Sequence, residues 1–233
     1  MAGAWRVVGA DSRRVRGRPA LLTRGQGGGP MTSVVATVDG AEVLVSEVDA
    51  SEERLRSTRL ANALPRSGTS EGRQLRRWLT QVLVTSRVVA AEAEAAGLTA
   101  DGAPTEAALL PHVAAQLEIG SVAASALADG LARALFVHVT AGVEVTEDEV
   151  RDYHCRNPFR FGGYARGSGG WRGHPVAAVF ADVRCDISEH LVAAARRREF
   201  RRWLDARRAE MVRLSPGYEH PGDPRQPDNT HKH

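Results

Sequence analysis

The residues best suited to chemistry lie near the C-terminus. Imidazole and carboxylate groups are good ligands for Zn²⁺ or Ni²⁺. The long spacing from the first histidine to the last two matches no established ligand pattern, so a divalent-metal site and a simple polar tail both stay open. The candidate ligands are His220, Asp223, His231 and His233.

Two other arrangements invite a nucleophilic interpretation. His154 precedes Cys155, but adjacent helical residues point about 100° apart and do not face each other. Ser67 in "PRSGTSEG" and Ser168 in "ARGSGGW" lack the G-x-S-x-G spacing of a nucleophile elbow. We find no catalytic constellation in the sequence, and we expect binding rather than catalysis.

Aromatic side chains are the candidate binding residues, namely Trp78, Tyr153, Phe161 and Trp203. Both tryptophans lie on apolar helical stripes, where a place in the core is the alternative. His112 and His138 are surrounded by apolar residues, and we expect them to be partly buried and neutral.

The bulk composition is that of a globular protein. Of 233 residues, 42% are hydrophobic and 25% charged, enough for one ordinary domain or two small ones. The net charge is +3 and the pI about 9.3, with arginines clustered at 13–24 and 196–213. Aromatic residues for base stacking are sparse, so we interpret these clusters as solvated and expect no nucleic-acid partner.

Cysteine usage favours a reduced, cytoplasmic setting. Cys155 and Cys185 form no CxxC motif, although a bridge between them stays open because both fall near a helix junction. No stretch approaches the ~20 apolar residues of a membrane span, so no membrane partner is expected. Residues 1–33 are predicted to be a disordered Arg/Gly-rich leader, and Met31 is an alternative start.

The pattern from residue 34 onward predicts a mainly helical domain over 34–215. Alternating valines around Asp39-Gly40 indicate a β-hairpin, because this dipeptide favours a type I′ turn. Ser46 and Ser70 are expected to cap the first two helices, Pro111 to break the third, and Thr146 with Glu149 to form a capping box at the start of the fifth. The predicted helices span residues 46–64, 71–96, 105–119, 121–140, 146–157 and 176–211.

Three segments of the domain are not predicted to be helical. Residues 162–175 are Gly-rich and indicate a flexible linker. Residues 212–214 could form a short strand. Residues 216–233 form a polar, Pro- and His-containing tail without a core of its own.

The order of these parts resembles the chaperone domain of SurA/PpiC-type periplasmic folding factors. The resemblance rests on "VVATVDGAEVLVSEVD", "VTEDEVRDYHCRNPFRF" and the terminal helix beginning "FADVRCDI". In that family a parvulin prolyl isomerase domain follows the second motif, and a terminal helix and strand then close the first domain. The resemblance implies that residues 212–214 extend the hairpin to a three-stranded sheet. Here residues 162–175 are too few for even a small domain, so we expect the parvulin domain and its activity to be absent.

The tail "PGYEHPGDPRQPDNTHKH" resembles a family of uncharacterised actinobacterial proteins, some from natural-product gene clusters. Members often carry the label malonyl-CoA:acyl-carrier-protein transacylase, which needs a nucleophilic serine and an activating histidine.

We therefore expect a non-catalytic, chaperone-like binding or accessory protein with a protein or peptide partner, serving a biosynthetic pathway. The alternative is a biosynthetic enzyme, either that transacylase or a metal-dependent activity of the tail histidines. The oligomeric state stays open.

Overall fold

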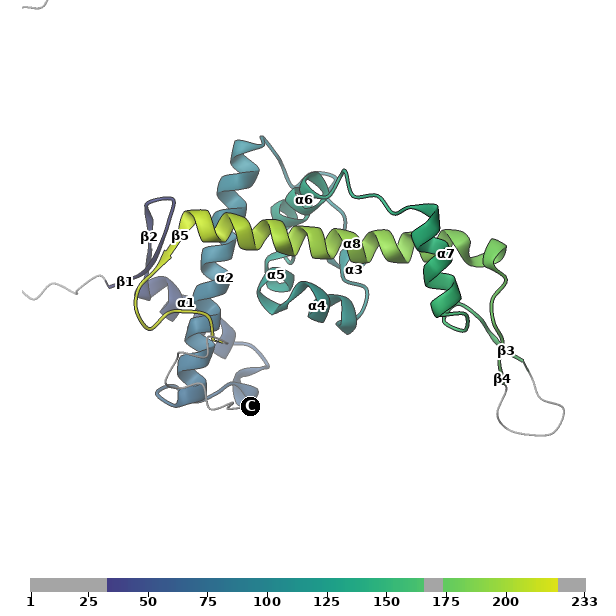
Figure 1. Cartoon of the computed structure of the whole chain (residues 1–233). Coiled ribbons are helices and arrows are strands. Elements are labelled where there is room, and N and C mark those ends of the chain that lie inside the picture. Colours follow the sequence, from purple (N-terminus) through teal and green to yellow (C-terminus); the bar gives the residue numbers. More distant parts are fainter. Residues whose placement is uncertain (1–32, 166–173, 222–233) are drawn as a thin grey trace, which may run out of the picture. The chain divides into compact units, whose positions relative to one another are not determined.

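The computed structural model describes residues 33–165 and 174–221. The predictions for the leader, for Ser168 and for the tail beyond Pro221 therefore lie outside the described residues. Within them the protein is mainly helical with a small antiparallel sheet, as expected (Figure 1). No described helix combines the length and apolarity that crossing a bilayer requires.

Strands from opposite ends of the domain form one sheet. β1 (Val34–Val38) and β2 (Ala41–Leu44) make the predicted hairpin, and the turn residues Asp39 and Gly40 both have positive φ, +48° and +81°. β5 (Val212–Leu214) pairs antiparallel with the other edge of β1, giving the order β2-β1-β5. The predicted third strand is thus confirmed, and it joins the two ends of the described domain.

The first helix begins and ends earlier than predicted. α1 covers Val45–Arg56, and a 3₁₀ turn, η1 (Ala61–Ala63), follows it. Its N-cap is Leu44, whose backbone N–H donates to the Glu47 carboxylate at 3.1 Å. The prediction of a Ser46 cap was wrong because the chain passes directly from β2 into the helix.

The long second helix is the centre of the fold. α2 (Ser70–Ala95) is capped by Thr69, whose hydroxyl accepts from Gly72 N–H, one residue before the predicted cap. It packs against β1 and α1 and also against α5, α6 and α8. Val84 and Val88 are therefore fully buried, whereas Ala90 is exposed.

Four short helices follow α2 in place of the two predicted segments. They are α3 (Glu106–Leu109), α4 (Val113–Ile119), α5 (Ser121–Ala126) and α6 (Gly130–Val139).

Local caps account for two corrections among these helices. The break at Pro111 is confirmed, but a single helix over 121–140 was wrong, because Asp129 accepts from Leu131 N–H and starts α6. His112 and His138 are exposed rather than partly buried, and His112 Nδ1 caps α4 by accepting from Ala115 N–H.

The last two helices pack on each other. α7 (Glu147–Arg156) has the predicted capping box between Thr146 and Glu149. α8 (Phe180–Met211) begins four residues later than predicted. Between them the described ends of the predicted linker pair as two short strands, β3 (Tyr164–Ala165) and β4 (His174–Pro175).

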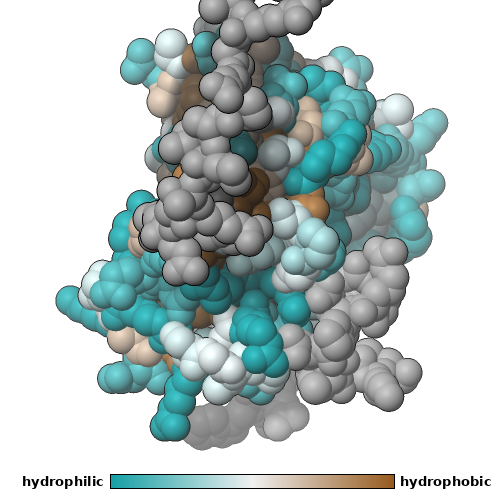
Figure 2. All heavy atoms as spheres, turned by 90° about the vertical axis from the view of Figure 1, so that its left-hand side faces the viewer, coloured by the Kyte–Doolittle hydropathy of each residue, from teal (hydrophilic) through white to brown (hydrophobic). Residues whose placement is uncertain are grey.

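The buried side chains form two clusters. The larger, main core lies among the sheet, α2, α4 to α6 and the C-terminal half of α8, and includes Val35, Val84 and Phe200. The smaller, outer core lies between α7 and the N-terminal half of α8; its buried members are Val150, Val183 and Ile187. The face that carries the sheet is largely hydrophilic where it is described (Figure 2).

Two arginines of α8 correct the prediction that the cluster at 196–213 is solvated. Arg197 is only 4% exposed, and its Nε donates to the Glu118 carboxylate at 2.7 Å. Arg208 donates to the Gln81 side chain on α2. Both turn inward because α4 and α2 supply acceptors that sequence spacing along α8 does not reveal.

Candidate functional site

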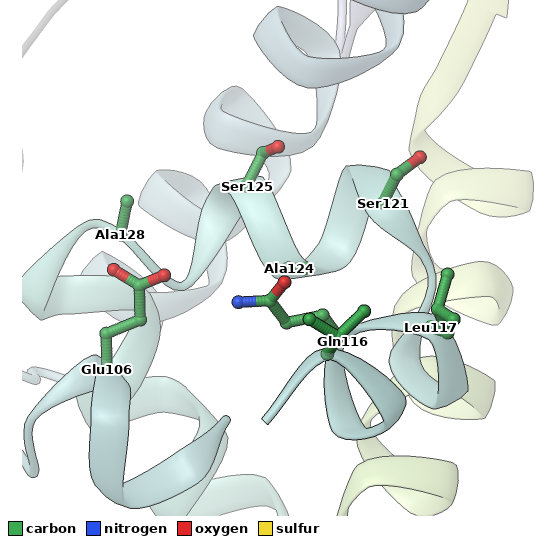
Figure 3. A pocket seen from close by; sticks show the side chains of 8 residues that line it. Glu106, Gln116, Leu117, Ser121, Ala124, Ser125 and Ala128 are labelled. Carbon is green, nitrogen blue, oxygen red and sulfur yellow. The ribbon is translucent and has the colours of Figure 1, made fainter. Parts of the chain in front are cut away.

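A groove of about 320 Å³ lies among α3, α4 and α5 (Figure 3). We call it the α4 groove. It is positioned by two breaks in the chain, at Pro111 before α4 and at Gly120 after it. Gly120 has φ +90°, a conformation that L side chains rarely adopt, so α5 starts at once in a new direction. The groove is lined by Glu106, Val113, Gln116, Leu117, Ser121, Ala124, Ser125 and Ala128.

α4 presents apolar side chains on two sides. Ala115 and Ile119 enter the main core. Val113 and Leu117, four residues apart and therefore neighbours on one helix face, are 68% and 75% exposed. A single exposed apolar residue is ordinary, but two on one helix face beside a concave surface are a feature of binding sites.

Polar groups accompany this apolar pair. The Glu106 carboxylate and the Gln116 amide extend toward each other from α3 and α4 (Figure 3). Ser121 and Ser125 are one turn apart on α5, and the Ser121 hydroxyl accepts from Trp78 Nε1 at 3.3 Å. The groove therefore offers both donors and acceptors beside apolar surface, a combination suited to a peptide backbone with apolar side chains.

The two tryptophans among the candidate binding residues belong to the edge of the main core. Both are partly buried against it. Trp203 stacks on Phe200 with ring centroids 5.7 Å apart. Trp78 reaches the α4 groove only through its hydrogen bond to Ser121. The interpretation of these side chains as core residues is supported.

The other two candidates, Tyr153 and Phe161, meet in the outer core. Their ring centroids lie 6.4 Å apart, and the Tyr153 hydroxyl is 3.3 Å from His190 Nε2. Burial, followed by the charges of Arg160 and Arg197, lowers the pKa of His190. Sequence reasoning missed His190, since nothing in the spacing along α8 marked it as a partner of α7.

The candidate nucleophiles make structural contacts. The Ser67 hydroxyl donates to the Glu52 carboxylate at 3.1 Å. His154 Nε2 donates to the Ala178 carbonyl oxygen at 2.9 Å, and its ring lies 5.3 Å from that of Phe180, while Cys155 is exposed. The two cysteines are both free thiols, so the bridge left open above is not formed.

The metal hypothesis rests mostly on residues beyond the described ones. His220 is described, whereas Asp223, His231 and His233 are not. Within residues 33–165 and 174–221, no three His, Cys, Asp or Glu side chains gather as ligands for a metal.

Comparison with known proteins gives one match. Residues 34–71 match the model of a family of unknown function (DUF7158). No curated protein and no solved structure matches the chain. The matched segment comprises the hairpin, α1 and the first residues of α2, and it does not reach the α4 groove.

Proposed function

We propose that this protein is a non-catalytic, chaperone-like binding or accessory protein whose α4 groove accepts an apolar segment of a protein partner. The exposed, stacked pair Val113 and Leu117 beside the groove is the observation that carries the proposal. Covering two such side chains removes apolar surface from water at about 25 cal/mol per Å².

The polar groups of the groove support the same function. A bound segment, whether extended or helical, presents unpaired backbone groups or polar side chains at its edges. Glu106 and the side-chain carbonyl of Gln116 can accept hydrogen bonds, while Ser121 and Ser125 can also donate them. The apolar pair then contributes affinity, and these groups fix the orientation of the segment.

The resemblance to the SurA/PpiC-type chaperone domain belongs to this proposal. That resemblance implies a terminal strand that returns to the first hairpin, and the pairing of β5 with β1 supports it. The proposed setting, a cytoplasmic accessory role in an actinobacterial secondary-metabolism pathway, rests on the resemblance of the tail and on the cysteine usage.

The proposal is tested by changing the apolar pair. We expect Leu117→Asp, alone and with Val113→Asp, to weaken binding of a fluorescently labelled leucine-rich peptide at least tenfold. The matched control is Leu60→Asp, since Leu60 is 57% exposed and lies outside the groove. Thermal unfolding followed by circular dichroism checks that all variants are folded. Wild-type affinity in a folded Leu117→Asp variant would contradict the proposal.

A further inference from the structure

A second cavity adjoins the α4 groove at the start of α5. It has a volume of about 280 Å³ and lies between the start of α5 and the C-terminal half of α8. Ser121 lines both the groove and this cavity, which we call the α8 cavity. Figure 3 shows Ser121 at the end of α5 that is nearer to α8.

Arg208 brings a poorly compensated positive charge to the α8 cavity. Its guanidinium donates to Gln81 Oε1, a neutral acceptor, and its Nε is buried without a hydrogen-bond partner among the described residues. No described carboxylate forms an ion pair with it. Burial lowers the pKa of Arg208, and the charge of Asp205 only partly opposes this shift. A desolvated cation without an acceptor of opposite charge is costly.

The position of Arg208 is fixed by the segment after β5. Gln81 donates through Nε2 to the Tyr218 carbonyl oxygen at 3.0 Å, which directs its Oε1 toward Arg208. Arg77 donates to the neighbouring Gly217 carbonyl oxygen at 3.0 Å. The same turn leads to His220, which also lines the cavity.

The other charges of the cavity leave it net positive. Arg201 lines it as well and donates to the Glu118 backbone carbonyl oxygen at 3.3 Å. Asp205 is the one acid among the described lining residues, and its Oδ2 is 4.0 Å from Arg201 Nε, a long ion pair. Two guanidinium groups thus face one carboxylate.

We propose that the α8 cavity binds a carboxylate carried by the same segment that occupies the α4 groove. The partner is then a peptide in which apolar residues adjoin an acidic side chain. Guanidinium groups match the planar carboxylate and can bind it through two hydrogen bonds. This inference rests on the proposed function and adds a chemical requirement to the partner.

The test compares two labelled peptides that differ only in charge. One is Ala-Leu-Leu-Ala-Glu-Ala-amide, and the other has Gln in place of Glu. We expect the Glu peptide to bind the full-length protein about tenfold more tightly in fluorescence titrations at low salt. Arg208→Gln and, separately, Arg201→Gln should remove most of this difference, because each removes a proposed guanidinium partner of the Glu carboxylate.

Arg202→Gln is the control, because Arg202 is exposed on α8 and does not line the cavity; it should keep the full difference. If Arg208→Gln fails to fold, the exposed Arg201 still provides the test. Equal binding of both peptides to the wild type would overturn the inference but not the proposed function of the α4 groove. A difference that persists in folded Arg201→Gln and Arg208→Gln would also overturn it. Binding of neither peptide would overturn the proposed function together with the inference.

Discussion

The two ends of α8 belong to regions held together in different ways. The C-terminal half completes the main core, where Phe200 is fully buried and β5 pairs with β1 from the other end of the domain. The N-terminal half packs on α7 around Ile187, with few other enclosed side chains. One region thus depends on contacts distant in sequence, whereas the other is a local helix pair with a small core.

The ion pairs of the two regions also differ in how far they are enclosed by the protein. Glu52 on α1 is 7% exposed and accepts from Arg56, Arg76 and Ser67, which ties α1 to α2. In the outer region Glu147 pairs with Arg184 at 2.7 Å, but both side chains are exposed. Enclosed networks resist salt while exposed pairs are screened, so the two regions should respond differently to solution conditions.

Removing the closing elements should have the largest effect. A fragment of residues 31–161 lacks β5 and α8, so β1 loses one partner and the main core loses Phe200 and Leu204. We expect this fragment to aggregate and to show no cooperative unfolding, as measured by size-exclusion chromatography and circular dichroism melts. A soluble fragment with a cooperative transition would show that the main core does not need α8.

Phe200→Ala should be the most damaging single change considered for the main core. Phe200 is fully buried, and its ring lies 5.1 Å from that of Phe136. Truncating a buried Phe costs about 3–5 kcal/mol, a large part of a typical stability of ~5–15 kcal/mol. Urea unfolding should give this loss, and a change below about 1 kcal/mol would contradict the assignment of Phe200 to the core.

Ile187→Ala should act locally in the outer core. Ile187 is fully buried, and the truncation costs about 2–5 kcal/mol of local packing. We expect faster hydrogen exchange of α7 amides, while the slowest amides of α2 keep their protection, because few contacts other than α8 join α7 to the rest. Equal acceleration in α2 would mean that both regions unfold as one unit.

Arg197→Ala and Arg202→Ala compare two arginines of the same helix. Arg197 is 4% exposed and bonded to Glu118, so we expect its loss to cost about 1.5–3 kcal/mol, as for a hydrogen bond to a charged group. Arg202 is exposed and should cost under ~0.5 kcal/mol. Equal effects in urea unfolding would mean that the inward position of Arg197 contributes nothing to stability.

The smallest expected effect is a difference between the two regions in how their stability depends on acid pH. Burial alone would raise the pKa of Glu52, but hydrogen bonds from Arg56, Arg76 and Ser67 outweigh it and hold that pKa below its usual value. The hydrogen bond from Arg184 lowers the pKa of Glu147. Each carboxylate then contributes stability that is present above the unfolded pKa of ~4.3 and is lost as pH falls through the lower folded pKa.

Stability measured from about pH 6 down to pH 3 tests this. Glu52→Gln should reduce the loss of global unfolding free energy on acidification, at both low and high salt. Glu147→Gln should reduce only the loss of hydrogen-exchange protection that the α7 amides show on acidification. We expect this effect only at low salt, because salt screens exposed ion pairs. If Glu52→Gln leaves the pH dependence of the global unfolding free energy unchanged, the Glu52 carboxylate does not contribute to the acid sensitivity.

Sequence alone was sufficient where a feature depends on a few neighbouring residues. The Asp39-Gly40 turn, the break at Pro111 and the box between Thr146 and Glu149 all follow from local backbone preferences and nearby N–H groups. The cap of α2 was misplaced by one position, since Ser67, Thr69 and Ser70 compete there, and the cap of α1 by two, because the helix follows β2 directly. The pairing of the third strand with the hairpin was predicted only with the help of a family resemblance, because the two strands lie far apart in the sequence.

Tertiary structure alone decided which polar side chains of α8 turn inward and which side of α4 is enclosed. The residues around Arg197 and Arg208 carry many charges, so their spacing gives no single apolar face, and acceptors on α4 and α2 turn these two inward. Val113 and Leu117 are of residue types that usually lie in a core, yet α4 buries its opposite side and leaves them in water. The hydrophobic effect is not directional, so only the packing of distant elements decides which face of α4 stays exposed.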